Sequence, residues 1–227
     1  MAVCRTAGVF LSQLRDGFRV CPCQLLHQAL PAVLALVYRD EAGHTPDYTG
    51  KVGIHIALPR LVDDVKHLDV ALTAMHDIGN AINRNRHAEY GGLLANEILK
   101  QYDLSIPDRI TIVSAISNHD ESTGGAVDPI SAALIIGDKT DVRRSRVREK
   151  PKATFDIHDR VNYAVTDQTL KINTEKKVIS LNLQIDTDIC SMYEYFEIFL
   201  QRMLMCRGAA DMLGATFKLT ANGAKVL

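Results

Sequence analysis

The apolar residues between Arg60 and Met75 recur at steps of four and three, and a polar pair follows them directly. The apolar positions are Leu61, Val65, Leu68, Leu72 and Met75. This spacing places them on one face of an α-helix. The helix is expected to end at His76, with Asp77 and Gly79 just beyond it. Glycine after a helix is a common stop, so this stretch alone fits either a plain helix end or a metal site.

A second helix is predicted to begin after Asn85, a residue type that often caps helices. Its inward face is made of residues three and four apart. These are His87, Gly91, Leu94 and Ile98. The small Gly91 would allow another segment to approach closely. We therefore expect His87 to face the interior from the start of a helix.

A third helix is predicted from Pro107, because proline is favoured in a first helical turn. One side of this helix carries an apolar stripe that ends on an imidazole. Its members are Ile112, Ala115, Ile116 and His119. His119 is therefore expected to point inward at the helix end.

A fourth helix is predicted to open at Asp128, a good cap, followed by Pro129, a good first residue. It is expected to continue through ISAALIIGDKTDVRRSRVR. Asp138 lies four residues after Leu134 and so shares the apolar side of this helix.

After Pro151 the pattern changes to strands and one more helix. The stretch TLKINTEKKVISLNLQID alternates around a polar turn, as a half-buried hairpin does. Residues 190–213 form an amphipathic pattern that Gly214 would end, and TFKLTANGAKVL could add a last strand and turn. The predicted fold class is therefore mainly α, a helical bundle with an appended C-terminal α+β segment made of an antiparallel hairpin and a long helix.

Bulk composition describes an ordinary globular protein. The 227 residues are 47% hydrophobic and 23% charged, with a formal net charge of -1, so no polyanionic partner such as nucleic acid is expected. The five cysteines are odd in number and show no C-x-x-C spacing, which favours reduced thiols and a cytoplasmic location. No apolar run reaches about 20 residues, and no secretory signal is evident, so no membrane association is expected.

The predicted helices together deliver five imidazole or carboxylate groups to the interior. They are His76, Asp77, His87, His119 and Asp138. A single histidine on an apolar face is usually a hydrogen-bonded core residue, but five such groups need a common reason. Burying two carboxylates together is costly unless a cation compensates for their charge. Mixed His/Asp ligation suits iron, manganese, zinc, cobalt or nickel better than calcium.

This ordered set resembles the HD superfamily of metal-dependent phosphohydrolases, in its dinuclear pattern H, HD, H, H, D. The adjacent pair lies in MHDIGN, the next histidine in RHAEYGG, the fourth in SNHDE and the closing aspartate in LIIGDKTD. The resemblance runs from about residue 60 to 150. It implies an HD metal-binding helical domain over residues 44–150, with a divergent helical segment at 1–43 and the α+β segment at 151–227 packed on it.

The first histidine of the family pattern usually lies some thirty residues before the His-Asp pair. His44 is 32 residues ahead of His76, and His55 is 21 ahead. We choose His44, because a helix from there back to the pair would supply a whole antiparallel partner. Pro46 and two nearby glycines weaken that helix, so the choice between His44 and His55 stays open.

The resemblance implies two divalent transition metal ions, iron or manganese first, with zinc, cobalt or nickel as alternatives. Asp77 would bridge them, with His44, His76 and Asp138 completing one and with two histidines completing the other. Those two are His87 and His119. A hydroxide held between the metals would attack phosphorus, and Asp77 and His119 are the expected catalytic residues. No P-loop or G-x-S-x-G motif is present to support other chemistry.

Phosphate substrates also need positive charge near the metals, and residues 139–150 are rich in it. Lys139, Arg143 and Arg146 would share one helical face if the fourth helix continued through them. They could clamp a phosphate, or they could simply offset the helix dipole in solvent. Arg84, in the loop before His87, is a fourth candidate for substrate binding.

The expected function is hydrolysis of a phosphate ester or anhydride in a nucleotide-like or other small phosphorylated metabolite. Two alternatives remain open at this point: an HD-type diiron oxygenase, and a non-catalytic nucleotide-binding module. The expected partner is a small phosphorylated substrate, and the C-terminal segment could also form a homodimer surface.

Overall fold

The computed structural model describes residues 75–102, 104–147 and 155–227. The predicted N-terminal segment 1–43, most of the predicted helix at 60–75, and both His44 and His55 lie outside these ranges. About 50% of the described part is helical, with five α-helices and one small sheet of four strands. The described part of the chain is thus mainly helical with an α+β C-terminal part, as predicted.

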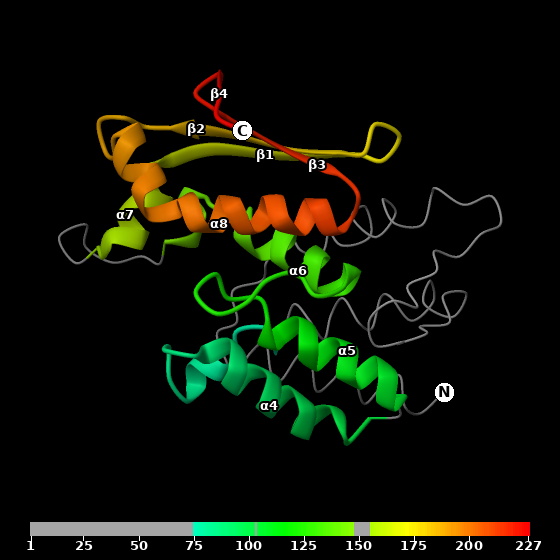
Figure 1. Ribbon diagram of the computed structural model, residues 1–227. Helices are drawn as coiled ribbons and strands as arrows, with labels where there is room; N and C mark the ends of the chain where they lie inside the picture. Colours follow the sequence, from blue (N-terminus) through cyan, green and yellow to red (C-terminus); the bar gives the residue numbers. More distant parts are fainter. Residues whose placement is uncertain (1–74, 103, 148–154) are drawn as a thin grey trace, which may run out of the picture.

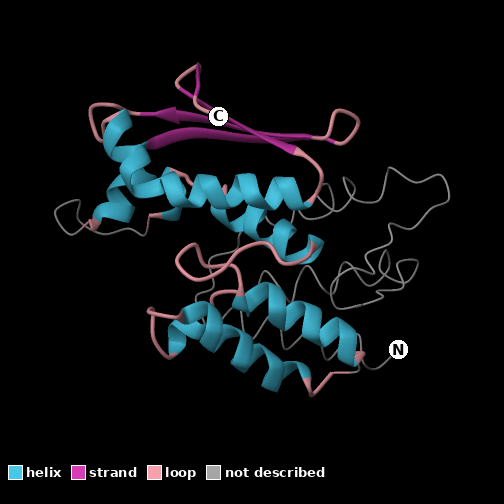
Figure 2. Cartoon of the chain, in the orientation of Figure 1, coloured by secondary structure: helices cyan, strands magenta, loops and turns pink. Residues whose placement is uncertain are grey.

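Four groups of elements stack on one another (Figure 1). Helices α4 (His87–Leu99) and α5 (Ile106–Ser117) pair at one end. The central helix α6 (Pro129–Lys139) packs between α5 and the long helix α8 (Met192–Met212). The sheet covers α8 on the side away from α6 (Figure 2). The short helix α7 (Ile157–Ala164) lies beside α8.

The helical part begins at the His-Asp pair. Met75 is helical and buried, His76 and Asp77 form the turn after it, and the 3-10 helix η2 (Ile78–Ala81) follows. The expected helix end at His76 is confirmed. The expected cap of α4 is wrong, because Arg86 rather than Asn85 precedes the helix, and its backbone has a left-handed φ of 61°.

Helix α4 buries a narrow face made of small residues. These are Ala88, Gly91, Gly92, Ala95 and Leu99. Leu94 and Ile98 are only partly buried, so the predicted inward face is displaced by about one position. The short side chains bring α4 close to its neighbours, where larger residues would have held them apart.

Helix α5 begins at Ser105, whose hydroxyl accepts from the backbone N–H of Asp108 at 3.3 Å. Pro107 lies in its first turn, as predicted. The apolar stripe that was expected to end at His119 is confirmed, and its residues are buried, with His119 only 1% exposed. His119 lies two residues past the end of the helix.

Helix α6 has a complete capping box, in which Asp128 accepts from Ser131 N–H and the Ser131 hydroxyl accepts from Asp128 N–H. All residues from Ile130 through Lys139 are buried, because α5 and α8 cover the helix from two sides. The helix ends at Lys139, much earlier than predicted. The separate 3-10 helix η3 (Arg144–Arg146) follows it.

The early end of α6 overturns one sequence prediction. Lys139, Arg143 and Arg146 cannot share a helical face, because Thr140 caps the helix and Arg143 has an extended backbone. Lys139 points into the interior and is only 4% exposed.

The C-terminal part contains the predicted hairpin. Strands β1 (Val165–Asn173) and β2 (Val178–Ile185) pair antiparallel, and β3 (Thr216–Ala221) then pairs with β2 in parallel. A parallel neighbour needs a crossover, and α8 supplies it. The two-residue strand β4 (Ala224–Lys225) closes the edge. Helix α7 was not predicted, although Asp156 and Asp159 form a capping box at its start.

Helix α8 joins the helical part to the sheet through one continuous core. Its buried residues include Tyr195, Phe199, Met203 and Cys206. Cys190 and Cys206, the two cysteines in the described part, are buried and form no disulfide there. Among the residues described, no helix is long and apolar enough to span a membrane.

The capping box of α6 yields the first prediction. Replacing Asp128 with alanine removes the acceptor for an N-terminal N–H of the central helix. The free energy of unfolding should fall by about 1 kcal/mol in urea denaturation. The control is Asp211→Ala, an exposed position near the end of α8, which should change it by less than about 0.5 kcal/mol. Equal effects of the two variants would contradict the role given to the box.

Candidate metal centre

Four segments carry five of the six predicted ligands, and in the described part of the chain these segments meet at one place. His76 and Asp77 lie in the turn before η2, and His87 is the first residue of α4. His119 follows the end of α5, and Asp138 is the last residue but one of α6. All of these positions are at or near helix ends, where a side chain can reach past the helix that carries it.

Two glycines allow this convergence. A Cβ on Gly79 would lie 1.9 Å from the backbone oxygen of His87 and 2.5 Å from the backbone nitrogen of Gly91. A Cβ on Gly91 would meet the backbone oxygen of His76 at 3.2 Å. Backbone therefore packs directly on backbone here, as the small Gly91 had suggested. This contact sets the distance between the Asp77 turn and the His87 imidazole.

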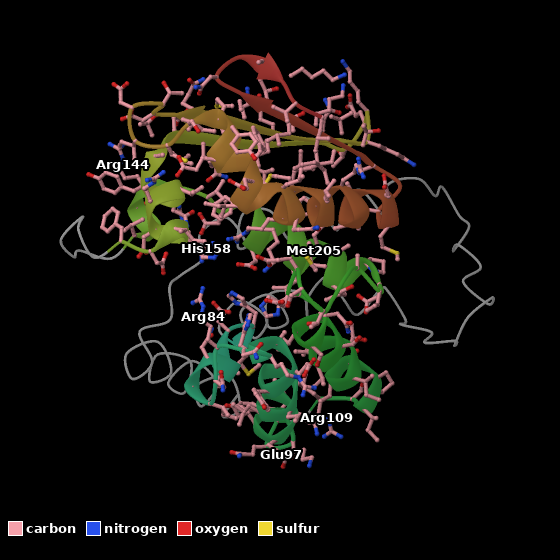
Figure 3. The ribbon with its side chains drawn as sticks, turned by 60° about the vertical axis from the view of Figure 1, so that its left-hand side comes forward. Arg84, Glu97, Arg109, Arg144, His158 and Met205 are labelled. Atoms are coloured by element: carbon pink, nitrogen blue, oxygen red, sulfur yellow. The ribbon has the colours of Figure 1, made fainter. Side chains whose placement is uncertain are left out.

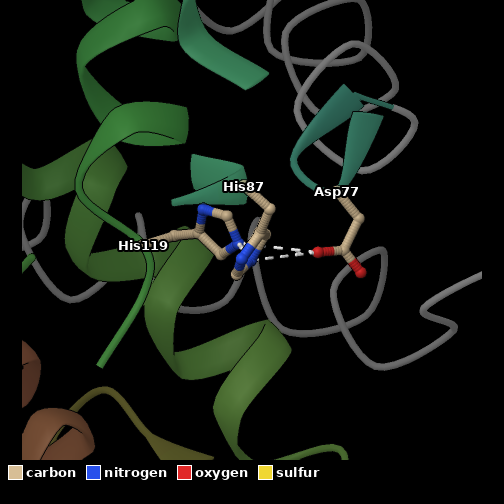
Figure 4. Close-up of side chains that lie close together, drawn as sticks. All are labelled: Asp77, His87 and His119. Carbon is tan, nitrogen blue, oxygen red and sulfur yellow. Dashed lines mark hydrogen bonds and ion pairs between the residues drawn. The ribbon is translucent and has the colours of Figure 1, made fainter. Parts of the chain in front are cut away.

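Asp77, His87 and His119 form a compact cluster (Figure 4). Nε2 of His87 lies 3.4 Å from Oδ1 of Asp77, and Nε2 of His119 lies 3.8 Å from the same oxygen. The two Nε2 atoms are 3.3 Å apart. Ligand atoms about 2.1 Å from one ion are typically separated by about 3.0 to 3.4 Å. The cluster could therefore hold a metal ion with little adjustment.

Backbone carbonyls fix which nitrogen each imidazole presents. Nδ1 of His119 lies 2.6 Å from the carbonyl oxygen of Ile116, and Nδ1 of His87 lies 3.1 Å from that of Arg84. A carbonyl can only accept, so in both rings Nδ1 donates its hydrogen. A neutral ring then offers the lone pair of Nε2 to the cluster, which is the usual arrangement of metal-binding histidines.

The charges of the cluster also fit a cation. Burial lowers the pKa of His119, and this outweighs the opposing contact with Asp77. Burial by itself would raise the pKa of Asp77, but His76 and His119 outweigh it and the pKa lies well below its usual range. When His119 is neutral with its hydrogen on Nδ1, the lone pair of Nε2 faces the carboxylate oxygen of Asp77. Two acceptors at this distance repel unless a cation lies between them.

A second group of ligand atoms lies on the other side of Asp77. Oδ2 of Asp77 is 3.6 Å from Nε2 of His76, which is itself 3.8 Å from Oδ1 of Asp138. His76 and Asp138 are both buried. Each oxygen of Asp77 therefore faces a different set of predicted ligands.

A buried lysine holds the other oxygen of Asp138. Nζ of Lys139 lies 2.8 Å from Oδ2 of Asp138 and 2.7 Å from Oε2 of Glu121. Burial alone would lower the pKa of Lys139, but these two carboxylates raise it, so the ammonium stays protonated. The lysine thus fixes Asp138 with Oδ1 turned toward His76, and it is not a free clamp for substrate.

The cluster opens into a cavity of about 230 Å³. Its lining includes three of the four basic residues that were predicted to bind substrate, namely Lys139, Arg84 and Arg146. Figure 3 shows Arg84 at the end of the α4–α5 pair that is nearest to the C-terminal part. The fourth, Arg143, does not line the cavity, because it pairs with the buried carboxylate of Asp141 at 2.7 Å.

Two further residues belong to the site. Asp120 lines the cavity, and its Oδ2 lies 3.7 Å from Nδ1 of His87, so its negative charge is close to that ring. Arg202 of α8 lines the cavity from the C-terminal part and was not predicted. Its position in an amphipathic helix gave no local signal, because only the packing of α8 on α6 brings it here.

Comparison of the chain with protein-family models, with curated proteins and with solved structures found no match.

The close contact of Gly79 yields the second prediction. Gly79→Ala would force the Asp77 turn away from α4, because the new methyl group cannot share space with the backbone of His87. We expect a loss of stability of about 1–3 kcal/mol and a weaker affinity for divalent metal, measured by urea denaturation and metal titration. The control is Gly125→Ala, whose Cβ would meet nothing within 4 Å. Unchanged metal affinity in Gly79→Ala would show that this contact does not set the ligand geometry.

Proposed function

We propose that this protein is a metal-dependent phosphohydrolase of the HD type that cleaves a phosphate ester or anhydride. The observation that carries the proposal is the position of the Asp77 carboxylate. One of its oxygens faces His87 and His119, and the other faces His76. A carboxylate whose two oxygens face different imidazole groups is suited to bridging two cations.

The residues fit two divalent transition metals, with iron or manganese preferred for a mixed His/Asp set. Asp77, His87 and His119 would hold one ion, and Asp77, His76 and Asp138 would contribute to the other. His44 remains the proposed further ligand of the second ion. Bound metal would lower the pKa of a water and withdraw charge from a phosphoryl oxygen.

The surrounding residues prepare this site for an anionic substrate. Lys139 keeps Asp138 ionised and oriented, and the carbonyl of Arg84 orients the imidazole of His87. Arg84 and Arg146 line the cavity beside the ligands and can bind phosphate oxygens. This concentration of cationic groups favours phosphate over a dioxygen substrate, which needs no positive charge in its pocket.

Metal content provides the third prediction. Protein purified without chelator and supplemented with iron or manganese should hold about two ions per chain. Asp77→Ala should lose both, because it removes the carboxylate that faces both ligand sets, while its helix content stays unchanged in circular dichroism. Asp211→Ala serves as the control and should keep its metal. A parent protein that stays metal-free after supplementation would defeat the dinuclear centre.

Turnover provides the fourth prediction. The manganese-loaded protein should release phosphate, or cleave a phosphodiester, when assayed with phosphomonoesters, phosphodiesters and nucleotides. Asp77→Ala should lower kcat/KM by about 10³-fold, since several kcal/mol of transition-state stabilisation depend on the metals. Asp211→Ala should match the parent. Oxygen uptake by the iron-loaded protein without cleavage would favour the oxygenase, and no turnover of any kind would favour a binding module.

A further inference from the structure

Arg202 extends from α8 into the cavity of the metal centre. Its guanidinium lies 5.0 Å from the ring centre of Phe199, and its Nη2 donates to the backbone oxygen of Asp138 at 3.4 Å. The ring and the carbonyl together restrict where the guanidinium can go. Its charge is therefore held in place beside the proposed metal ligands.

The guanidinium has more donors than the described residues use. Arginine carries five N–H groups, and the buried Nε of Arg202 has no hydrogen-bond partner in the part of the chain that the structure describes. The nearby carboxylates of Asp138 and Glu121 already form ion pairs with Lys139, which lies between them. With metal bound at Asp77 and Asp138, the arginine would add to a surplus of positive charge, which suits an anionic ligand.

A second cavity of about 270 Å³ adjoins the first. The same helix forms its wall through residues four and three apart, Gln201, Met205 and Gly208. The loop residues Gly124 and Gly125 line it as well. Figure 3 shows Met205 on the side of α8 that faces α6.

Glu121 lines both cavities, so they lie next to each other beside α8. Each cavity is slightly smaller than the range of about 300–1,000 Å³ that is typical of small-molecule sites, so a ligand larger than phosphate would contact residues of both. The first is lined almost entirely by charged groups. The second cavity is lined by the thioether of Met205 and the amide of Gln201. Its glycines have no side chains that could fill the space.

We propose that α8 forms one wall of the substrate site, with Arg202 binding the phosphate group and the Gln201–Met205–Gly208 stripe contacting the organic part. This inference rests on the proposed function. The ligand class is a phosphomonoester of a compact organic group that carries hydroxyl or amino donors, such as a nucleoside or a sugar. The carboxylate of Glu121 and the amide of Gln201 can accept from such donors.

The role of Arg202 is tested by titration calorimetry of the metal-loaded full chain with inorganic phosphate. Arg202→Met keeps the length of the side chain and removes its charge. The Kd should rise at least about tenfold, as expected for the loss of a charge-assisted hydrogen bond. Arg202→Lys should recover part of the affinity. The matched control is Arg207→Met on the exposed side of α8, which should bind within about twofold of the parent.

Metal content is measured in every variant, because Arg202 also contacts the backbone of Asp138. Retained metal with weakened phosphate binding supports the proposal. A Kd for Arg202→Met within twofold of the parent overturns it. Loss of metal in this variant also overturns it, since Arg202 would then be a structural partner of Asp138.

The contact between the Gln201–Met205–Gly208 stripe and the organic part of the ligand is tested separately at Gly208. A Cβ added to Gly208 would meet no atom within 4 Å. Gly208→Leu should weaken binding of a nucleoside monophosphate and of a hexose phosphate several-fold more than binding of inorganic phosphate, and Gly208→Ala should have a smaller effect. An equal change in affinity for all three ligands would contradict a contact between this stripe and the organic part of the ligand. A parent that binds these esters without cleaving them contradicts the hydrolase but supports the binding site.

Discussion

The contact between Gly79 and the first turns of α4 is the constraint on which the site depends. It brings two backbones together with no side chain between them, at His87 on one side and next to Asp77 on the other. Packed backbones are stiff, because neither has a rotamer through which it can yield. The imidazole of His87 is thereby held at a ligand distance from a carboxylate in a different segment. The 3.4 Å separation of these groups follows from this contact.

Buried charge imposes the second constraint. Asp138 is only 5% exposed, and a carboxylate in such a position requires compensation. Lys139 supplies it on one side and shares its ammonium with Glu121. The other oxygen of Asp138 stays directed at His76. The end of α6 therefore provides both the candidate ligand Asp138 and the residue that orients it. Lys139 is occupied by these ion pairs and stabilises the fold, so it is not available to bind substrate.

Much of the local structure could be predicted because its signals are local. Asp128 and Pro129 mark the start of α6, the stripe ending at His119 marks the buried side of α5, and alternation marks the hairpin. The predictions that failed relied on local sequence where the structure depends on distant partners. The helix that opens at Asp128 was predicted to continue through Arg148, but α6 ends at Lys139, where the chain turns and buries the carboxylate of Asp141. No short window of sequence contains the partners that decide such an ending.

The sequence by itself determined the chemical character of the candidate centre, because imidazoles and carboxylates stand at inward positions of four expected helices. It also determined the order of helices followed by a hairpin. Tertiary structure alone decided which nitrogen of His87 and His119 faces Asp77, since backbone carbonyls from neighbouring turns hold the other nitrogen. It alone brought Arg202 to the cavity from 64 residues beyond Asp138. Hydrophobic periodicity identifies the buried side of a helix, but the neighbour that it meets depends on how whole elements pack.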